Sequence, residues 1–275
     1  MKKLLFGTFV IVFTLSSVLV NAQAKKGAYV GVNVGYNAAG GAANLQSLQN
    51  FTQTASSIYE TENIKMSFGK GVSAGVNLGY MFNENLGFDL GINYLVGGKT
   101  NATSKQINGD YDKSTVSAKM IQIKPSVVLA TKIKNVMPYA KLGLVLGSAK
   151  VTEAGENKSA STIISQKIEL KNGLAIGFNA AMGVNIPMNK KLTFSAEVNT
   201  INMQYSPKKG TQTEYKVNGA DKLSTLSIYQ KEVKYVKKEV NNYSIPPVTT
   251  TPNELAAIAL PFGSIGVNIG VKYSF

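Results

Sequence analysis

Apolar and polar residues alternate with a period of two in eight stretches of the chain after residue 26. In residues 28–37, valines and Tyr36 occupy the even positions from 30, whereas Gly31, Asn33 and Gly35 lie between them. Such alternation is typical of β-strands with one apolar and one polar face. The eight predicted strands are residues 28–37, 71–82, 86–96, 118–130, 137–149, 173–186, 192–205 and 265–275.

The connections between these strands are alternately long and short. Three are short, at Asn83–Asn85, 131–136 and Pro187–Lys191, and a long connection stands on either side of each. Antiparallel strands joined in this way form an up-and-down barrel with all of its long loops at one end. We therefore predict an all-β fold, an eight-stranded antiparallel up-and-down barrel.

The second face of the strands distinguishes a membrane barrel from a soluble one. It consists mostly of Gly, Asn and Ser with few charges, whereas a face in water would be rich in Lys, Glu and Asp. Small residues suit a narrow lumen. The apolar face extends for about ten residues per strand, the length that crosses a bilayer. We predict a transmembrane barrel with short periplasmic turns and long extracellular loops.

Aromatic residues are found near the ends of the predicted strands, where the two membrane interfaces would lie. Those at the short-turn end are Tyr80, Phe82, Phe88, Phe194, Tyr273 and Phe275, and those at the long-loop end are Tyr36, Tyr94, Tyr205 and Phe262.

The N-terminal segment has the pattern of a secretory signal peptide. Met1-Lys2-Lys3 is basic, the stretch from Leu4 to about Val20 is apolar, and small residues follow. We predict a signal peptide at residues 1–22, with cleavage near residue 22 or 24, and a barrel domain at 23–275. An uncleaved N-terminal anchor is the alternative.

Composition excludes several kinds of chemistry. The 275 residues include no Cys, His or Trp, and all 29 basic residues are Lys. Without Cys and His there is no thiolate nucleophile, no Ser-His-Asp triad and no His-ligated metal. We expect no enzymatic activity, no cofactor and no metal. The net charge of +14 would suit nucleic acid, but the predicted location disfavours it.

Charged residues on the polar strand face are the candidate site. Lys124 and Lys141 flank the same turn and are expected to lie opposite each other, with Asp89 compensating Lys124. Glu197 and Lys272 are expected on adjacent strands. We interpret these five residues as a charge network that plugs the lumen, because unpaired charge there is costly. An ion or ligand path is the alternative, and acid–base chemistry by Asp89 and Glu197 is a weaker one.

Two long loops contain local patterns of their own. The spacing of Leu45, Leu48, Phe51, Ala55, Ile58 and Tyr59 predicts a short helix that caps the barrel or contacts a partner. In the last loop, alternation over 223–240 predicts a hairpin, and the capping-box pattern from Thr251 predicts a helix through Leu260. Lysines of this loop near the outer leaflet could neutralise lipopolysaccharide phosphates.

The end of the chain, Gly270 to Phe275, alternates apolar and aromatic residues and finishes with Phe. It resembles the signal read by the barrel-assembly machinery, with Val271, Tyr273 and Phe275 as its residues. Repeated Gly-Val-Asn-x-Gly units are similar to the strands of small outer-membrane β-barrel proteins of Gram-negative bacteria. The mature chain resembles that group, which includes opacity-type proteins, porin-like barrels and the membrane domain of outer membrane protein A. Exclusive use of Lys hints at a Bacteroidota-like source.

The resemblance implies Sec-dependent export to the cell outer membrane. The implied partners are outer-membrane lipids and lipopolysaccharide, together with the barrel-assembly machinery and periplasmic chaperones during biogenesis. Because members of this group differ widely in function, the fold does not assign one. We expect a monomeric surface protein with a structural or adhesin-like role, whose long loops contact an unidentified extracellular partner. The alternative is a narrow porin-like channel for small solutes or ions.

Overall fold

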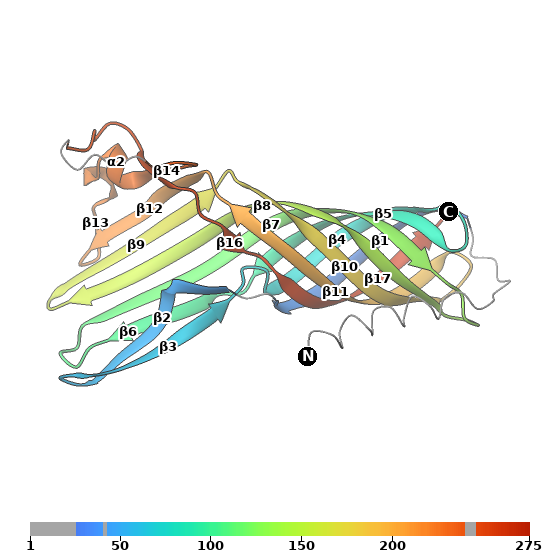
Figure 1. Ribbon diagram of the computed structural model, residues 1–275, viewed down its shortest axis with the longest axis horizontal. Coiled ribbons are helices and arrows are strands. Elements are labelled where there is room, and N and C mark those ends of the chain that lie inside the picture. Colours follow the sequence, from blue (N-terminus) through green and yellow to red (C-terminus); the bar gives the residue numbers. More distant parts are fainter. Residues whose placement is uncertain (1–25, 41–42, 240–245) are drawn as a thin grey trace.

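The computed structural model describes residues 26–40, 43–239 and 246–275 (Figure 1). The predicted signal peptide, residues 1–22, lies outside the described residues. Among the described residues, no helix is both long and apolar enough to cross a membrane. The described chain is almost entirely β-structure, and the all-β prediction is confirmed.

Eight of the described strands pair side by side in a closed ring (Figure 1). In the ring, β1 pairs with both β4 and β17, and every other member also has two ring neighbours. Each of the eight predicted strands falls on one of them. In spatial order the ring strands are β1 (Gly27–Ala39), β4 (Gly71–Met81), β5 (Leu86–Gly97), β7 (Tyr111–Ala130), β8 (Met137–Ser159), β10 (Leu174–Pro187), β11 (Leu192–Ser206) and β17 (Ser264–Ser274).

The two faces of the ring strands follow the predicted alternation. Apolar side chains point outward, so that Leu142 and Phe178 are each 66% exposed, whereas Asn93 is 2% exposed in the lumen. Glycines on the inner face leave room for neighbouring strands. A Cβ on Gly143 would collide with the Pro125 carbonyl, so only glycine fits there.

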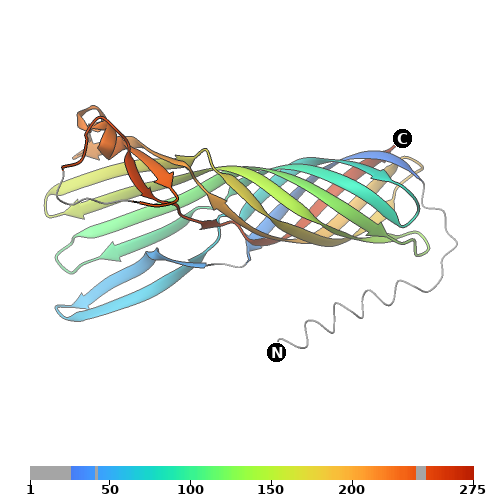
Figure 2. The same ribbon diagram turned by 45° about the horizontal axis from the view of Figure 1, so that its top comes forward.

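Beyond one end of the ring, the strands continue as an open, curved sheet, here called the extension (Figures 1 and 2). It contains the distal parts of β7 and β8, and β9 and β12 continue the lines of β10 and β11. The sheet order is β3-β2-β6-β7-β8-β9-β12-β14-β15. Its other strands are β2 (Ala43–Ala55), β3 (Ile58–Met66), β6 (Thr100–Lys105), β9 (Thr162–Lys171), β12 (Lys209–Val217), β14 (Glu232–Val236) and β15 (Asn253–Ala256), with the short strands β13 (Ala220–Asp221) and β16 (Leu260–Pro261) beside them.

The helix predicted in the first long loop is wrong, because this segment forms the β2–β3 hairpin. Phe51 stacks on Tyr59 across the hairpin, with ring centroids 5.2 Å apart, and Leu48 is buried. The hairpin also joins the sheet through Phe51, which lies opposite Ser104 of β6. An extended segment can use the same apolar residues in a sheet, and this pairing overrides the helical spacing.

The predictions for the last long loop are also wrong. In place of the hairpin predicted over 223–240, the described residues 223–239 contain two short helices, η2 (Leu223–Thr225) and α2 (Ile228–Lys231), and then β14, which pairs with β12. In place of the helix predicted from Thr251, β15 runs parallel to β14. Both local signals are overridden because the edge of the extension offers these segments a strand partner.

An apolar plug closes the lumen at the base of the extension. It is a cluster of buried side chains centred on Phe262, which is fully buried between Phe68 and Tyr205 at centroid distances of 5.5 and 5.8 Å. The connections that carry the two phenylalanines are joined by a hydrogen bond from Phe68 N to Pro261 O of 2.9 Å. The plug therefore ties the first and last long connections together across the mouth of the ring.

The plug corrects two predicted interface aromatics. Tyr205 and Phe262 are both 0% exposed, so a place at the outer surface is wrong for them. Tyr205 lies at an odd position of a strand whose outward residues, such as Val198, are even, and Phe262 precedes β17. The other predicted interface residues, among them Tyr36 and Tyr80, are exposed or half-buried, and their contact with a membrane stays a prediction.

We predict that Phe262→Ala lowers the free energy of unfolding by about 3–5 kcal/mol, because it leaves a cavity between two buried aromatic rings. Urea unfolding of the refolded protein in detergent measures this loss. The matched control is Ile107→Ala in an exposed turn, for which a change below about 0.5 kcal/mol is expected. Equal effects of the two substitutions would contradict a packed plug.

Candidate functional site in the lumen

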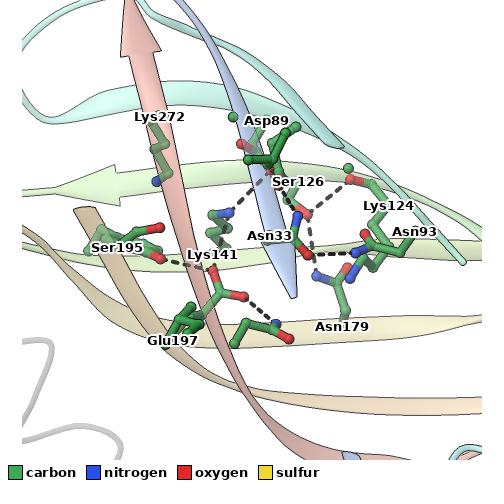
Figure 3. A pocket seen from close by; sticks show the side chains of 17 residues that line it. Asn33, Asp89, Asn93, Lys124, Ser126, Lys141, Asn179, Ser195, Glu197 and Lys272 are labelled. Atoms are coloured by element: carbon green, nitrogen blue, oxygen red, sulfur yellow. Dashed lines mark hydrogen bonds and ion pairs between the residues drawn. The ribbon is translucent and has the colours of Figure 1, made fainter. Parts of the chain in front are cut away.

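The candidate site is a buried ion triad in the ring. Lys141 of β8 lies between Asp89 of β5 and Glu197 of β11, with its Nζ 3.2 Å from a carboxylate oxygen of each (Figure 3). The side chains are 8%, 3% and 13% exposed, respectively. Since the three strands are separated by β7 on one side and β10 on the other, the triad bridges the lumen rather than neighbouring strands.

Neutral donors complete the hydrogen bonding of both carboxylates. Asp89 accepts hydrogen bonds from the Tyr29 hydroxyl at 2.6 Å and from the Asn77 amide at 2.8 Å. Glu197 accepts from the Tyr139 hydroxyl at 3.0 Å. A buried carboxylate with several donors is stabilised in its charged form, which is the form that the ion pairs with Lys141 require.

An asparagine chain extends this network along the lumen. The amide of Asn93 donates to Asn33 at 2.8 Å, Asn33 donates to Asn77 at 2.5 Å, and Asn77 donates to Asp89. Asn33 and Asn77 are the central residues of two Gly-Val-Asn-x-Gly units. In these units, the flanking glycines permit close strand approach, and the asparagine supplies both a donor and an acceptor to the lumen.

The structure pairs the predicted network residues differently from the sequence prediction. Asp89 pairs with Lys141 and not with Lys124, which has no ion pair within 4.0 Å among the described residues. Lys141 faces Val128 in the β7–β8 register, so the predicted Lys124–Lys141 juxtaposition is wrong.

The cause of this error is the turn between β7 and β8. The turn closes on an Ile133↔Val136 bridge, and Lys134 within it has a positive φ of 54°. The predicted juxtaposition requires the chain to reverse between residues 132 and 133, whereas the observed bridge puts the reversal between residues 134 and 135. The observed register displaces Lys124 by four residues, or about 13 Å, from the partner position of Lys141.

Lys272 has neutral partners in the ring. It lies on β17 next to β11, as predicted, but it faces Thr193, and Glu197 faces Asn268. Its Nζ donates to Asn185 at 2.9 Å and lies 4.6 Å from the centroid of the Tyr139 ring. An amide acceptor and an aromatic face together stabilise a partly desolvated ammonium group.

Little free volume remains in the lumen. A cavity of about 30 Å³ adjoins the triad, and one of about 120 Å³ at the short-turn end is lined by Lys272 and Asn185 among others. Volumes of this size hold a few water molecules. In the described ranges, no group of three or more acidic, His or Cys residues could hold a metal ion. The arrangement can therefore hold the ring closed and filled.

Outside the lumen, a larger hollow with a volume of about 710 Å³ lies on the outer face of the extension, over β7, β8 and β9. At its edge, the Tyr111 hydroxyl and Lys113 donate to Glu156 at 2.9 and 3.3 Å. These two hydrogen bonds lower the pKa of Glu156. The hydrogen bond from Tyr111 to Glu156 also raises the pKa of Tyr111. The sequence prediction misses this surface because it assigns residues 97–117 and 150–172 to loops.

The residues of the predicted assembly signal lie at the end of β17. Val271 and Phe275 are exposed on the outer surface, and the Tyr273 ring packs against Phe275 with centroids 5.3 Å apart. Their reading by an assembly machinery stays a prediction.

A ring with an apolar exterior and a filled polar interior defines the class of β-barrels that belong in a membrane. Residues 8–227 match the family described as "Outer membrane protein beta-barrel domain", and the chain belongs to this family. This membership places the protein among outer-membrane barrels.

The other comparisons add little. No curated protein matches the chain. Among solved structures, the chain is similar to OmpT (in-vitro folded), an outer membrane protein of Vibrio cholerae, at 8% identity. The alignment covers 90% of this chain and 96% of that one, with a TM-score of 0.10, a value too low to carry any argument.

We predict that Lys141→Met destabilises the barrel by about 3–5 kcal/mol, because it leaves Asp89 and Glu197 buried without their cation. Unfolding in urea measures this loss. Adding Asp89→Asn and Glu197→Gln to the variant should restore most of it. The matched control is Lys124→Met, which removes a lumen lysine without an ion pair. An equal loss in this control would contradict the central place of the triad.

Proposed function

We propose that the protein is an eight-stranded transmembrane barrel that anchors a surface-exposed β-sheet, the extension, for structural or adhesin-like contacts. The ring's apolar exterior would face lipid, the short turns would lie in the periplasm, and the extension would lie outside the cell. Support comes from the family, from closure without a free edge in the ring, and from the position of every long connection at one end.

The observation that carries this proposal is the filling of the lumen at two levels. The triad around Lys141 occupies the middle of the ring, and the apolar plug around Phe262 occupies its mouth. A conducting path would have to break both an ion network and a packed apolar layer. A sealed barrel is an anchor, and its function then belongs to what it displays.

The display surface is large for a barrel of this size. Strands β7 and β8 are 20 and 23 residues long, about twice what a bilayer crossing requires. At the tip of the β2–β3 hairpin, Ile58 and Tyr59 are 59% and 55% exposed. Exposed apolar side chains on a projecting hairpin favour contact with an extracellular partner.

The alternative function is a narrow channel for small solutes or ions. Lys124 and Lys272 favour it, because neither has an ion pair among the described residues and both line the cavity beside the triad. The small volume of that cavity opposes it. An enzymatic role is not part of the proposal, because both carboxylates of the lumen are bound to the same lysine and the chain has no His or Cys.

The same family and fold bear on the protein's route to the membrane and on its partners. We infer Sec export with cleavage near residue 22 or 24, assembly by the barrel-assembly machinery with periplasmic chaperones, and a monomer in contact with outer-membrane lipids and lipopolysaccharide. The closed ring supports the monomer, because a barrel has no edge strand that a second copy must cover.

For the sealed lumen, we predict no steady openings when the refolded protein is inserted into planar lipid bilayers. Single-channel recording measures this directly. Steady openings whose ion selectivity changes with Lys124→Glu, but not with the control Lys105→Glu on exposed β6, would support the channel instead.

For the orientation, we predict that Ser57→Cys reacts with a membrane-impermeant maleimide on intact cells that express the full chain. Ser57 lies in the turn of the β2–β3 hairpin, and the natural chain has no Cys to give background. The control Lys190→Cys, in the exposed turn before β11, should react only after permeabilisation. The opposite labelling pattern would refute the proposed orientation.

A further inference from the structure

A row of lysines crosses five neighbouring strands of the extension. Lys119 of β7 lies opposite Lys150 of β8, Lys171 of β9 lies opposite Lys209 of β12, and Lys209 also lies opposite Lys234 of β14. Lys150 and Lys171 are each one residue beyond the Val151↔Leu170 pair, so they adjoin each other as well. We call these five residues the lysine row. At the usual strand spacing, it is about 19 Å long.

The lysine row lies on the outer face of the sheet. The sequence neighbours of its members point the other way, into the apolar plug and the concave face of the extension. These inward neighbours are Ala118, Met120, Ala149, Val151, Leu170 and Tyr235. The five strands follow one another side by side (Figures 1 and 2), so the five ammonium groups share one surface.

Like charges placed directly opposite one another on a sheet are unfavourable. Three row lysines have acidic partners: Lys150 with Glu169 at 2.7 Å, Lys209 with Glu232 at 2.9 Å, and Lys234 with Glu254 at 2.7 Å. Lys119 and Lys171 have no ion pair in the described part of the chain. Five lysines against three glutamates leave a net charge of +2 on this surface.

On β7, β8 and β9, the lysine row marks the level at which the apolar exterior of the ring ends. On β11, the exposed polar residues Asn202, Gln204 and Ser206 separate the apolar exterior from Lys209. On β7, the outward residues that follow Lys119 are Ile121 and Ile123, and both are exposed. On β8, the exposed residue Leu146 lies four residues before Lys150 and on the same face of the strand. Leu174 is the first exposed apolar residue after Lys171. With the ring's exterior in lipid, the lysines lie at the headgroups, where their apolar stems extend along the hydrocarbon boundary.

We propose that the lysine row binds the phosphate groups of a phosphorylated glycolipid of the outer leaflet, the chemistry of lipid A. This inference rests on the proposed function, which puts the extension outside the cell. A lipid fits better than a soluble anion, because Lys119, Lys150 and Lys171 adjoin an apolar surface that would take the acyl chains. Phosphates at Lys119 and Lys171 would neutralise the charge that no carboxylate of the described residues neutralises.

The test compares binding of two probes, diphosphorylated lipid A and its dephosphorylated form, to the full-length protein in detergent by native mass spectrometry. The double variant Lys119→Gln/Lys171→Gln should bind diphosphorylated lipid A about tenfold more weakly than the natural protein. The control Lys105→Gln/Lys158→Gln removes two lysines outside the row that likewise have no ion pair in the described residues, and it should bind as the natural protein does. Heat-dependent gel mobility checks that each variant is folded.

Three results would overturn the proposal: unchanged binding by the row variant, equal loss in both double variants, or equal binding of the two lipid forms. Displacement of the lipid by millimolar inorganic phosphate would also overturn it, since a free anion would then satisfy the site. Orientation is measured separately by thiol labelling at Ser57→Cys. Loss of lipid binding with correct labelling rejects the lysine row alone, whereas inverted labelling rejects the proposed function.

Discussion

Closing eight strands into a ring leaves an interior only as wide as the side chains that fill it, and most features of the ring follow from this constraint. Many inward positions are glycine where a neighbouring backbone approaches, as at Gly143, and many others are asparagine or serine. A charge buried in such an interior is stabilised by partners on other strands. Lys141 has such partners in Asp89 and Glu197, which it bridges across the lumen, and their remaining hydrogen bonds extend the network along the ring.

Where the same strands leave the ring, their apolar side chains change from the outward to the inward face. Along β7, the outward residues Ile121 and Ile123 are apolar, but from Lys119 towards the tip the outward residues are polar and the inward ones, such as Val116, form a core. Water outside the extension in place of lipid explains the exchange, because each face follows its solvent. The apolar plug is then the base of a second, water-exposed β-structure that continues the ring without a break.

Period-two alternation is sufficient to predict the ring strands and their faces, because each strand keeps one environment over about ten residues. It fails where the environment changes along a strand. The extension is predicted as loops, since the apolar face is exchanged near Lys119, and Tyr205 is predicted outside although its strand position is inward. Pairing across the lumen is not predictable either: a turn that closes on Ile133↔Val136 moves Lys124 away from Lys141, and no local pattern reports that register.

The exchange of faces also determines which anions the lysine row can meet. Glu169 and Glu232 lie two residues from the lysine row on its side towards the tip of the extension. Glu254 lies opposite Lys234, the last lysine of the row. Towards the ring, the outward surface of β7, β8 and β10 is mostly apolar, that of β11 begins with neutral polar residues, and these four strands have no outward carboxylate there. The three glutamates therefore neutralise lysines of the row from the side that faces water, and the side that faces lipid has no acidic partner. A surface with that asymmetry attracts an anion whose remainder is apolar, which is the chemistry of a phosphorylated lipid and not of a soluble polyanion.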